Sequence, residues 1–125
     1  MTETQTIVSS QVLSDAIVEG MQENKAKDIK VMDLRGLPGA VCDFFVICSG
    51  DSKTQVDGIS QSIQRFTRKE YREKAWHVEG DRDSDWILLD YVNVVAHIFT
   101  REGREFYEIE ELWADAKVTH VPDVF

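Results

Sequence analysis

Apolar positions along the chain repeat with helical spacing in two places and form short runs elsewhere. Near the N-terminus they recur every three to four residues, which predicts an amphipathic helix from Ser10 to about Asn24. Its apolar positions are Val12, Leu13, Ala16, Ile17 and Met21. A second helix is predicted from Ser52 to about Lys74, because Ser52 and Gln55 form an S-x-x-Q capping box ahead of another apolar stripe.

Apolar runs that are too short for helices predict strands between and after these helices. The runs are 29–34, 44–48, 76–78, 86–91 and 94–99. The run Phe44–Cys48 is apolar throughout, which is typical of a strand that is buried on both faces. Only Val92 and Asn93 separate the last two runs, and Asn93 tolerates positive φ, so we expect a tight antiparallel hairpin.

Together these elements predict a single-domain α/β fold in which helices flank a mixed β-sheet. Residues 104–116 mix aromatic residues with acids and are expected to form short helical turns packed on the sheet. No linker, low-complexity tract or internal repeat divides the chain, so we expect one domain over residues 1–125 with its core at about 10–116. The N-terminal arm and the tail after Ala116 are left unassigned.

The charge balance narrows the classes of partner. The chain has 14 Lys and Arg against 23 Asp and Glu, a net charge of −9 at pH 7. Such a surface repels phosphate backbones and anionic lipid headgroups, so we expect little direct nucleic-acid contact and no membrane association. It favours a basic protein partner through long-range attraction. The longest wholly apolar run is far too short to span a bilayer, and we expect a soluble, cytoplasmic protein.

Residues that could bind a metal or form a disulfide are sparse. Cys42 and Cys48 fall in one predicted strand, so we expect two small buried apolar residues and no bridge between them. Asp81–Asp85 begins like a calcium loop, but Trp86 takes the place of its glycine and Val92 the place of its last glutamate. No metal site and no cofactor are expected.

Three carboxylates at or beside strands offer one enzymatic alternative. Asp33, Asp43 and Asp90 would suit a metal-dependent nucleotidyltransferase if they converged on the sheet. Such enzymes usually place two carboxylates two residues apart on one strand, so that both point to one face. None of the three has such a companion, so we expect no catalytic activity and keep the enzyme as an alternative hypothesis.

The hairpin carries large apolar groups on both faces. Trp86, Leu88 and Asp90 share one face of their strand, and Ile87, Leu89 and Tyr91 share the other. Either helices cover both faces, or one face is free for a partner. A tryptophan among apolar residues with an acidic rim suits a protein-binding surface. The same face would equally serve a homodimer, which is a further hypothesis.

An ordered set of motifs resembles the ribosomal silencing factor, or Iojap, family. The matching blocks are Asp43–Ile47, Ser49–Ser52, Glu79-Gly80, Trp86–Tyr91, Val94–Phe99 and Arg104–Trp113. They follow one another in the family's order and at its spacing, within a region from about Ser10 to Ala116. Each block alone is weak, but the ordered set is specific.

The resemblance implies a nucleotidyltransferase-like fold without catalytic residues, and a function in binding. The implied partner is the large ribosomal subunit, contacted through ribosomal protein L-fourteen. Bound there, the protein would block joining of the small subunit and repress translation under nutrient limitation. The expected contact residues are Trp86, Leu88, Asp90 and Tyr91, followed by Gly80, His97 and Tyr107.

The chain departs from the family pattern at two places. The family commonly has Gly-Asp between the hairpin strands, where this chain has Val92-Asn93. The turn therefore loses its glycine, and a branched residue lies next to the expected contact surface. The second departure is Cys42 in place of the usual alanine, a small residue for a small residue.

Overall fold

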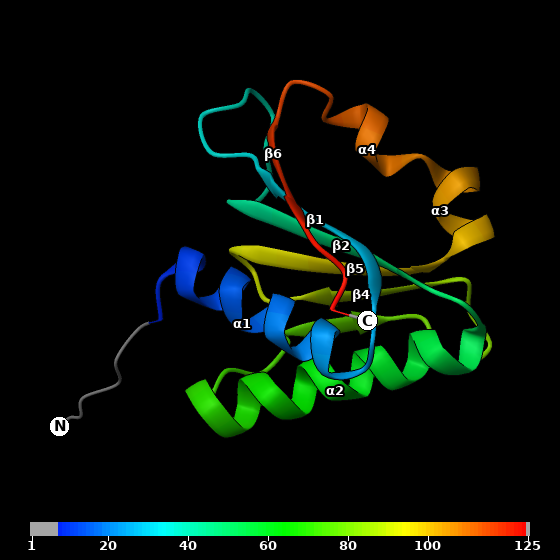
Figure 1. The fold of residues 1–125 in the computed structure, drawn as a ribbon. Coiled ribbons are helices and arrows are strands. Elements are labelled where there is room, and N and C mark those ends of the chain that lie inside the picture. Colours follow the sequence, from blue (N-terminus) through cyan, green and yellow to red (C-terminus); the bar gives the residue numbers. More distant parts are fainter. Residues whose placement is uncertain (1–7, 125) are drawn as a thin grey trace, which may run out of the picture.

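The computed structural model describes residues 8–124, which build a six-stranded mixed sheet with helices on both sides (Figure 1). The elements are α1 (Ser10–Glu23), β1 (Lys27–Asp33), β2 (Phe44–Gly50), α2 (Lys53–Tyr71), β3 (His77–Glu79), β4 (Trp86–Asp90), β5 (Val94–Thr100), α3 (Arg101–Tyr107), α4 (Ile109–Leu112) and β6 (Lys117–Val121). The strand order is β3-β4-β5-β2-β1-β6. β2 and β5 are parallel, and every other neighbouring pair is antiparallel.

Both long helices begin at the serine caps that their sequences supply. The Ser9 hydroxyl accepts a hydrogen bond from the Val12 amide, and the Ser52 hydroxyl accepts one from the Gln55 amide, each at 3.1 Å. The Gln55 side chain also accepts a hydrogen bond from the Asp51 amide. These bonds satisfy amides that have no partner inside a helix, so the predicted N-termini of α1 and α2 are confirmed.

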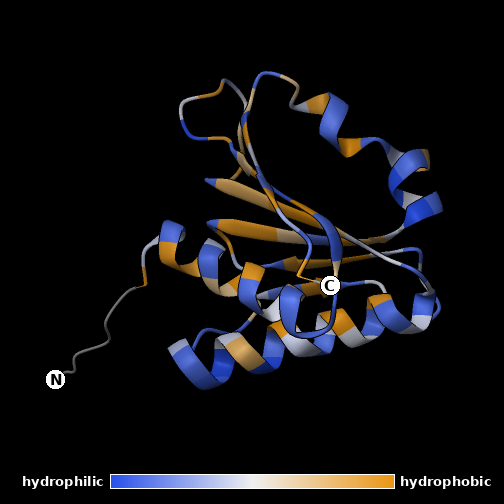
Figure 2. Cartoon of the chain, in the orientation of Figure 1, coloured by the Kyte–Doolittle hydropathy of each residue, from blue (hydrophilic) through white to orange (hydrophobic). Residues whose placement is uncertain are grey.

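α1 and α2 lie together under one face of the sheet (Figure 1). Alternate residues of the central strands point to these helices, and Figure 2 shows the central strands as strongly hydrophobic. Buried residues of this layer include Leu13, Ile17, Phe44, Val46, Ile59, Ile63, Leu89 and Ile98. All seven residues of β2 are buried, as predicted from its wholly apolar run, and all seven residues of β5 are buried as well.

The two helices approach each other most closely at Gly20. The buried Ser62 hydroxyl donates a hydrogen bond to the Gly20 carbonyl at 2.7 Å. A Cβ on Gly20 would lie 2.7 Å from the Cα of Ile63, which is closer than backbone and side-chain carbons can pack. Glycine at this position therefore sets how tightly α1 and α2 pack.

The opposite face of the sheet has a smaller, partial cover. α3, α4 and the loop between β1 and β2 lie over it, with Ile109 and Ala116 among the buried residues. The sequence left open whether helices cover both faces. The structure shows long helices on one face only, because the segments on the other side form α-helices of seven and four residues.

β6 was not predicted, because its side chains carry no strand pattern. Residues 117–121 pair antiparallel with β1, although four of these five residues are exposed. An edge strand can form through backbone hydrogen bonds alone, without the alternation that reveals a half-buried strand. The tail left unassigned by the sequence therefore completes the sheet.

Two local expectations were wrong. β2 begins at Phe44, so Cys42 lies outside the strand and is only partly buried, whereas Cys48 is fully buried. In the hairpin, positive φ occurs at Val92, with φ of 76°, and not at Asn93. The Asn93 amide donates to the Tyr91 carbonyl across Val92 at 3.0 Å, and the Asp90 carboxylate accepts from the Val92 amide at 2.7 Å. This three-residue γ-turn is strained, because a β-branched residue strongly disfavours positive φ.

We expect Gly20→Ala to lower the free energy of unfolding by about 2 kcal/mol, because the added methyl forces α1 away from α2. Denaturant unfolding measures this change. Glu19→Ala is the matched control, since Glu19 is an exposed neighbour in the same helix, and it should change the free energy by less than about 0.5 kcal/mol. Equal effects of the two substitutions would contradict the close-approach explanation.

We expect Val92→Gly to raise the free energy of unfolding by about 1 kcal/mol, because glycine removes the strain of positive φ. Val92→Ala is the control, since alanine keeps a Cβ at that φ and should gain clearly less. Both variants are compared with the parent chain by urea unfolding. If the glycine variant is no more stable than the alanine variant, the explanation by backbone strain at Val92 is wrong.

Candidate partner-binding face

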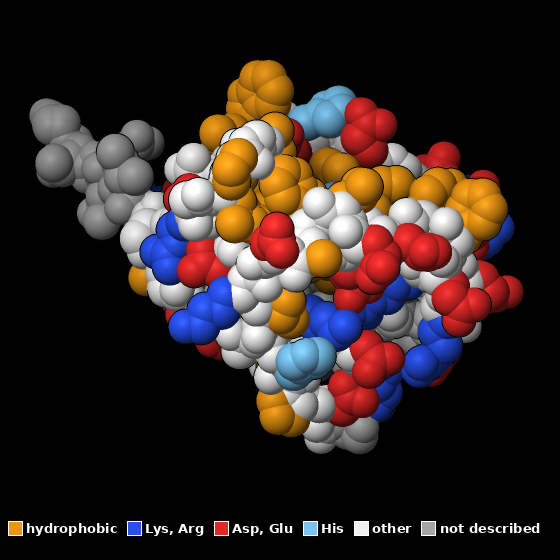
Figure 3. Space-filling view, turned by 90° about the horizontal axis from the view of Figure 1, so that it is seen from above, with side chains coloured by type: hydrophobic (Ala, Val, Ile, Leu, Met, Phe, Trp, Pro, Cys, Tyr) orange, Lys and Arg blue, Asp and Glu red, His pale blue; other side chains and the backbone are white. Residues whose placement is uncertain are grey.

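The face of the sheet opposite α1 and α2 carries several of the predicted contact residues, and we call it the open face. Its strand residues are Phe45 and Ile47 of β2, Trp86, Leu88 and Asp90 of β4, and Val95, His97 and Phe99 of β5. In the view from above, hydrophobic side chains gather over this side of the molecule and acidic side chains lie beside them (Figure 3). The residues of β2 and β5 on this face are buried, whereas Trp86, Leu88 and Asp90 of β4 are partly exposed. The accessible part of the open face is therefore the β4 side, which is apolar with an acidic border.

Trp86 is fixed at one end of the open face by aromatic contacts. Its ring stacks on Phe99 with centroids 5.0 Å apart and meets Tyr107 of α3 at 4.8 Å. Its indole Nε1 donates a hydrogen bond to Nδ1 of His97 at 3.1 Å. Trp86 is partly exposed, so a rigidly held aromatic surface is presented to solvent.

His97 lies beneath Trp86 and supports it. Only 4% of the residue is exposed, and burial lowers the pKa of its imidazole to about 3. The ring is therefore neutral at physiological pH, and because Nδ1 accepts from Trp86, its proton is on Nε2. Among the described residues Nε2 has no hydrogen-bond partner. We assign His97 a positioning role, since a partner cannot reach its ring.

The remaining predicted contact residues are not all on this face. Tyr91 points the other way, is buried under α2, and its hydroxyl hydrogen-bonds that of Thr67 at 2.9 Å. Gly80 follows β3 with φ of 93°, and a Cβ there would lie 2.5 Å from the Trp86 carbonyl oxygen. Gly80 therefore shapes the β3–β4 connection. Tyr107 is exposed beside Trp86.

Several exposed hydrophobic side chains on and around this side of the molecule were not predicted from the sequence. Val41 and Trp76 are 77% and 79% exposed, and Phe106 and Leu112 are 79% and 75% exposed. Val41, Phe106 and Leu112 lie in a loop or in short helices, where no periodic pattern distinguishes an exposed apolar residue from a buried one. Trp76 was placed in the predicted strand 76–78, but β3 begins at His77 and leaves Trp76 outside it.

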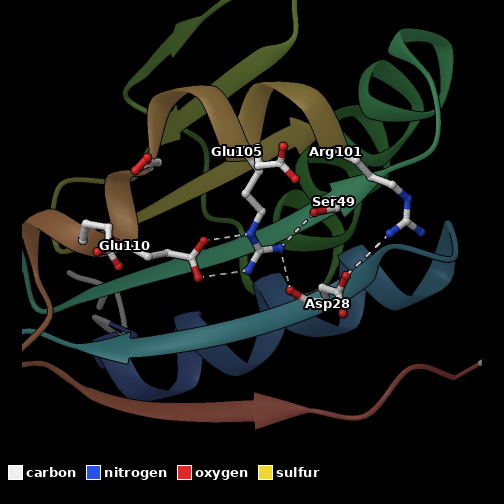
Figure 4. Close-up of a pocket in the computed structure, with 8 residues that line it drawn as sticks. Asp28, Ser49, Arg101, Glu105 and Glu110 are labelled. Atoms are coloured by element: carbon white, nitrogen blue, oxygen red, sulfur yellow. Dashed lines mark hydrogen bonds and ion pairs between the residues drawn. The ribbon is translucent and has the colours of Figure 1, made fainter.

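Figure 4 shows a charged clamp that fastens α3 and α4 to the sheet. Nε of Arg104 donates to the Glu110 carboxylate at 2.9 Å, and its Nη1 donates to the Asp28 carbonyl and the Ser49 hydroxyl. Lys30 of β1 adds an ion pair with Glu110 at 2.9 Å. Hydrogen bonding from Arg104, and then from Lys30, lowers the pKa of Glu110 to about 2. The clamp borders a pocket of about 490 Å³, whose further acidic lining is Glu105, Glu108 and Glu111.

The three carboxylates considered for metal binding are not grouped as ligands. Arg35 contacts both oxygens of Asp33, at 3.0 and 2.8 Å, and these hydrogen bonds lower the pKa of that carboxyl. Asp90 accepts the Val92 amide in the hairpin. Over residues 8–124, no three His, Cys, Asp or Glu side chains are close enough to share a metal ion. In the same range no helix has the length and apolar character needed to cross a membrane.

Burial also suppresses the reactivity of both cysteines. It raises the pKa of the Cys48 thiol to about 12 and that of Cys42 to about 11. The reactive form of cysteine is the thiolate, which is scarce at neutral pH when the pKa is so high. The open face therefore offers a partner apolar and aromatic surface and no reactive thiolate.

The clamp should make stability depend on pH below about 5. The pKa of Glu110 is lowered on folding, so its stabilisation is complete above the unfolded pKa near 4.5 and is lost as pH falls through about 2. From pH 7 to 3 we expect the parent chain to lose on the order of 1 kcal/mol more than Glu110→Gln, after allowance for solvent screening. Urea unfolding at both pH values measures the difference. Glu111→Gln, an exposed neighbour, should behave like the parent, and equal losses in all three chains would contradict the clamp.

Comparison with known proteins gives matches along nearly the whole chain. The family model described as "Ribosomal silencing factor during starvation" matches residues 7–124. The ribosomal silencing factor of Halalkalibacterium halodurans is 30% identical over 117 residues, covering 94% of this chain and 98% of that protein. The one from Bacillus subtilis is 35% identical over 94 residues, covering 75% and 78%. The chloroplastic Iojap protein of Zea mays is 33% identical over 108 residues, covering 86% of this chain and 46% of that protein.

Solved structures agree with these matches. A crystal structure of a protein from Chromobacterium violaceum has a TM-score of 0.80 and 29% identity, covering 94% of this chain and 97% of the other. A crystal structure from Bacillus halodurans has a TM-score of 0.76 and 27% identity, covering 90% and 100%. The single α/β domain and the resemblance found in the sequence are both confirmed, and the chain belongs to the ribosomal silencing factor family.

Proposed function

We propose that this protein binds the large ribosomal subunit through its open face and blocks joining of the small subunit. The contacted component is ribosomal protein L-fourteen, and the consequence is repression of translation when nutrients are limiting. The protein acts in the cytoplasm, where ribosomes initiate. Membership of the ribosomal silencing factor family supports this role, and the features of the open face below support the docking surface.

The observation that carries the proposal is the fixed position of Trp86. The ring is held by Phe99, Tyr107 and the hydrogen bond to His97, so little side-chain entropy is lost when a partner covers it. Binding energy at protein interfaces is concentrated in such preorganised aromatic residues near the centre of the contact. Leu88 and Asp90 follow on the same face of β4 and extend the surface by one apolar and one acidic group.

Charge supports a protein partner within the ribosome. A net charge of −9 opposes close contact with ribosomal RNA, because the phosphate backbone is also negative. Ribosomal proteins are usually basic, and an acidic surface is attracted to them over distances of about a Debye length. The acidic border of the open face therefore favours approach to a ribosomal protein.

The proposed mechanism is steric exclusion of the small subunit. Occupancy of a surface on the large subunit that the small subunit needs is enough to prevent their joining, so no covalent bond changes. The buried, neutral His97 and the two high-pKa thiols accord with a protein that acts by binding.

Trp86→Ala tests the docking surface directly. We expect a loss of at least tenfold in affinity for purified large subunits, measured by sucrose-gradient sedimentation, because the substitution removes the fixed aromatic anchor. Leu88→Ala is a second variant that leaves the aromatic stack intact and should also weaken binding. Tyr71→Ala is the control, since Tyr71 is an exposed aromatic residue at the end of α2.

Circular dichroism of each variant establishes that the fold is retained. Parent protein that sediments with neither subunit, or only as its own dimer, would refute the proposal. If both variants fold and bind large subunits as tightly as the parent chain, the open face is not the binding interface.

A further inference from the structure

A shallow hollow lies at the end of the open face that is far from α3. β4 and β5 pair from Trp86–Phe99 at one end to Asp90–Val95 at the other, and the hollow lies at the second end. Its volume is about 400 Å³. It is lined by Val41, Trp76, Asp90, Val92 and Val95, and we call it the hairpin hollow.

Three of the lining side chains are large, apolar and mostly exposed. Val41, Trp76 and Val92 are 77%, 79% and 56% exposed. They come from three separate segments: the loop before β2, the residue before β3 and the β4–β5 turn. Single exposed apolar residues are ordinary, but apolar residues from separate segments that converge on one hollow indicate an interaction site.

The backbone at Val92 adds an independent observation. A β-branched residue is held there at φ of 76°, in a turn that glycine would form without strain. Strain of this kind persists where the surrounding structure imposes it, and such strained residues cluster at binding sites. The turn places the Val92 side chain on the rim of the hollow, with more than half of the residue exposed to solvent.

The charge at the hollow is negative. Asp90 lies in its wall, and both Asp43 and Asp90 are near enough to the Cys42 thiol to help raise its pKa. Arg35, whose charge interacts with that of Asp43, is already paired with Asp33 through two hydrogen bonds to its carboxylate. An apolar hollow with acidic side chains at its wall complements an apolar side chain that has a Lys or Arg beside it.

We infer that the hairpin hollow is a second anchor point, which takes an apolar side chain from a basic segment of a large-subunit protein. The neighbouring Lys or Arg of that segment contacts Asp90. This inference rests on the proposed function, since the partner is the one that binds the open face. It adds Trp76, Val92 and Val41, which form a contact separate from the one around Trp86.

Two substitutions test the hollow with purified large subunits. Trp76→Ser removes its largest side chain, and Val92→Gly removes the rim while relieving strain. We expect each to weaken sedimentation with large subunits at least fivefold. For Val92→Gly the binding loss should accompany a gain in stability, so unfolding cannot explain it. Tyr71→Ser and Val12→Ser are the matched controls, being exposed apolar residues on α2 and α1, and they should bind as the parent does.

Photo-crosslinking identifies the occupant. A benzoylphenylalanine placed at position 76 is irradiated in the presence of purified large subunits, with position 71 as the control site. We expect crosslinks from position 76 to one ribosomal protein, in a peptide with an apolar residue within three positions of a Lys or Arg. A crosslink mainly to ribosomal RNA, or to a peptide without that pattern, would overturn the inference.

The outcomes separate the two proposals. If the parent chain binds and Trp86→Ala does not, while Trp76→Ser and Val92→Gly bind within twofold of the parent, the hollow is not an anchor and the open face still is. If the parent chain does not bind large subunits, both proposals fall.

Discussion

The parallel pairing of β2 and β5 is the constraint from which the rest of the structure follows. Two parallel neighbours cannot be joined by a tight turn, so the chain between them must cross the sheet through α2 before β3 and β4 are added. α2 then packs beside α1 on one face. Both long helices therefore cover that face, and only the short helices α3 and α4 cover the other. The open face is thus a consequence of topology.

Much of the fold could be predicted from sequence, because burial leaves a periodic pattern. α1, α2, β2 and the β4–β5 hairpin bury regular sets of side chains, so spacing revealed them. β6 was not predicted, because backbone pairing at the edge of a sheet needs no buried side chains. The turn was misassigned because propensity favours positive φ at Asn93, whereas the register of the two strands imposes it on Val92.

The candidate site was only partly predictable. The alternation of side chains along β4 correctly placed Trp86 and Leu88 on one face. Which face the long helices cover depends on the tertiary fold, and because α2 covers the other face, Tyr91 is buried. The Arg104–Glu110 clamp was equally invisible, since its other partners Asp28 and Ser49 are more than fifty residues away in sequence. Val41, Trp76 and Val92 come from three separate segments of the sequence, so only the folded chain brings them together.

Exposed tryptophan and valine side chains on one face create a solubility problem for the unbound molecule. Two free copies that meet through these apolar surfaces would tend to adhere. The net charge of −9 acts against this, because each molecule repels every other copy over about a Debye length. The acidic surface therefore has a second consequence: its repulsion opposes the adhesion of the exposed apolar side chains of one copy to those of another.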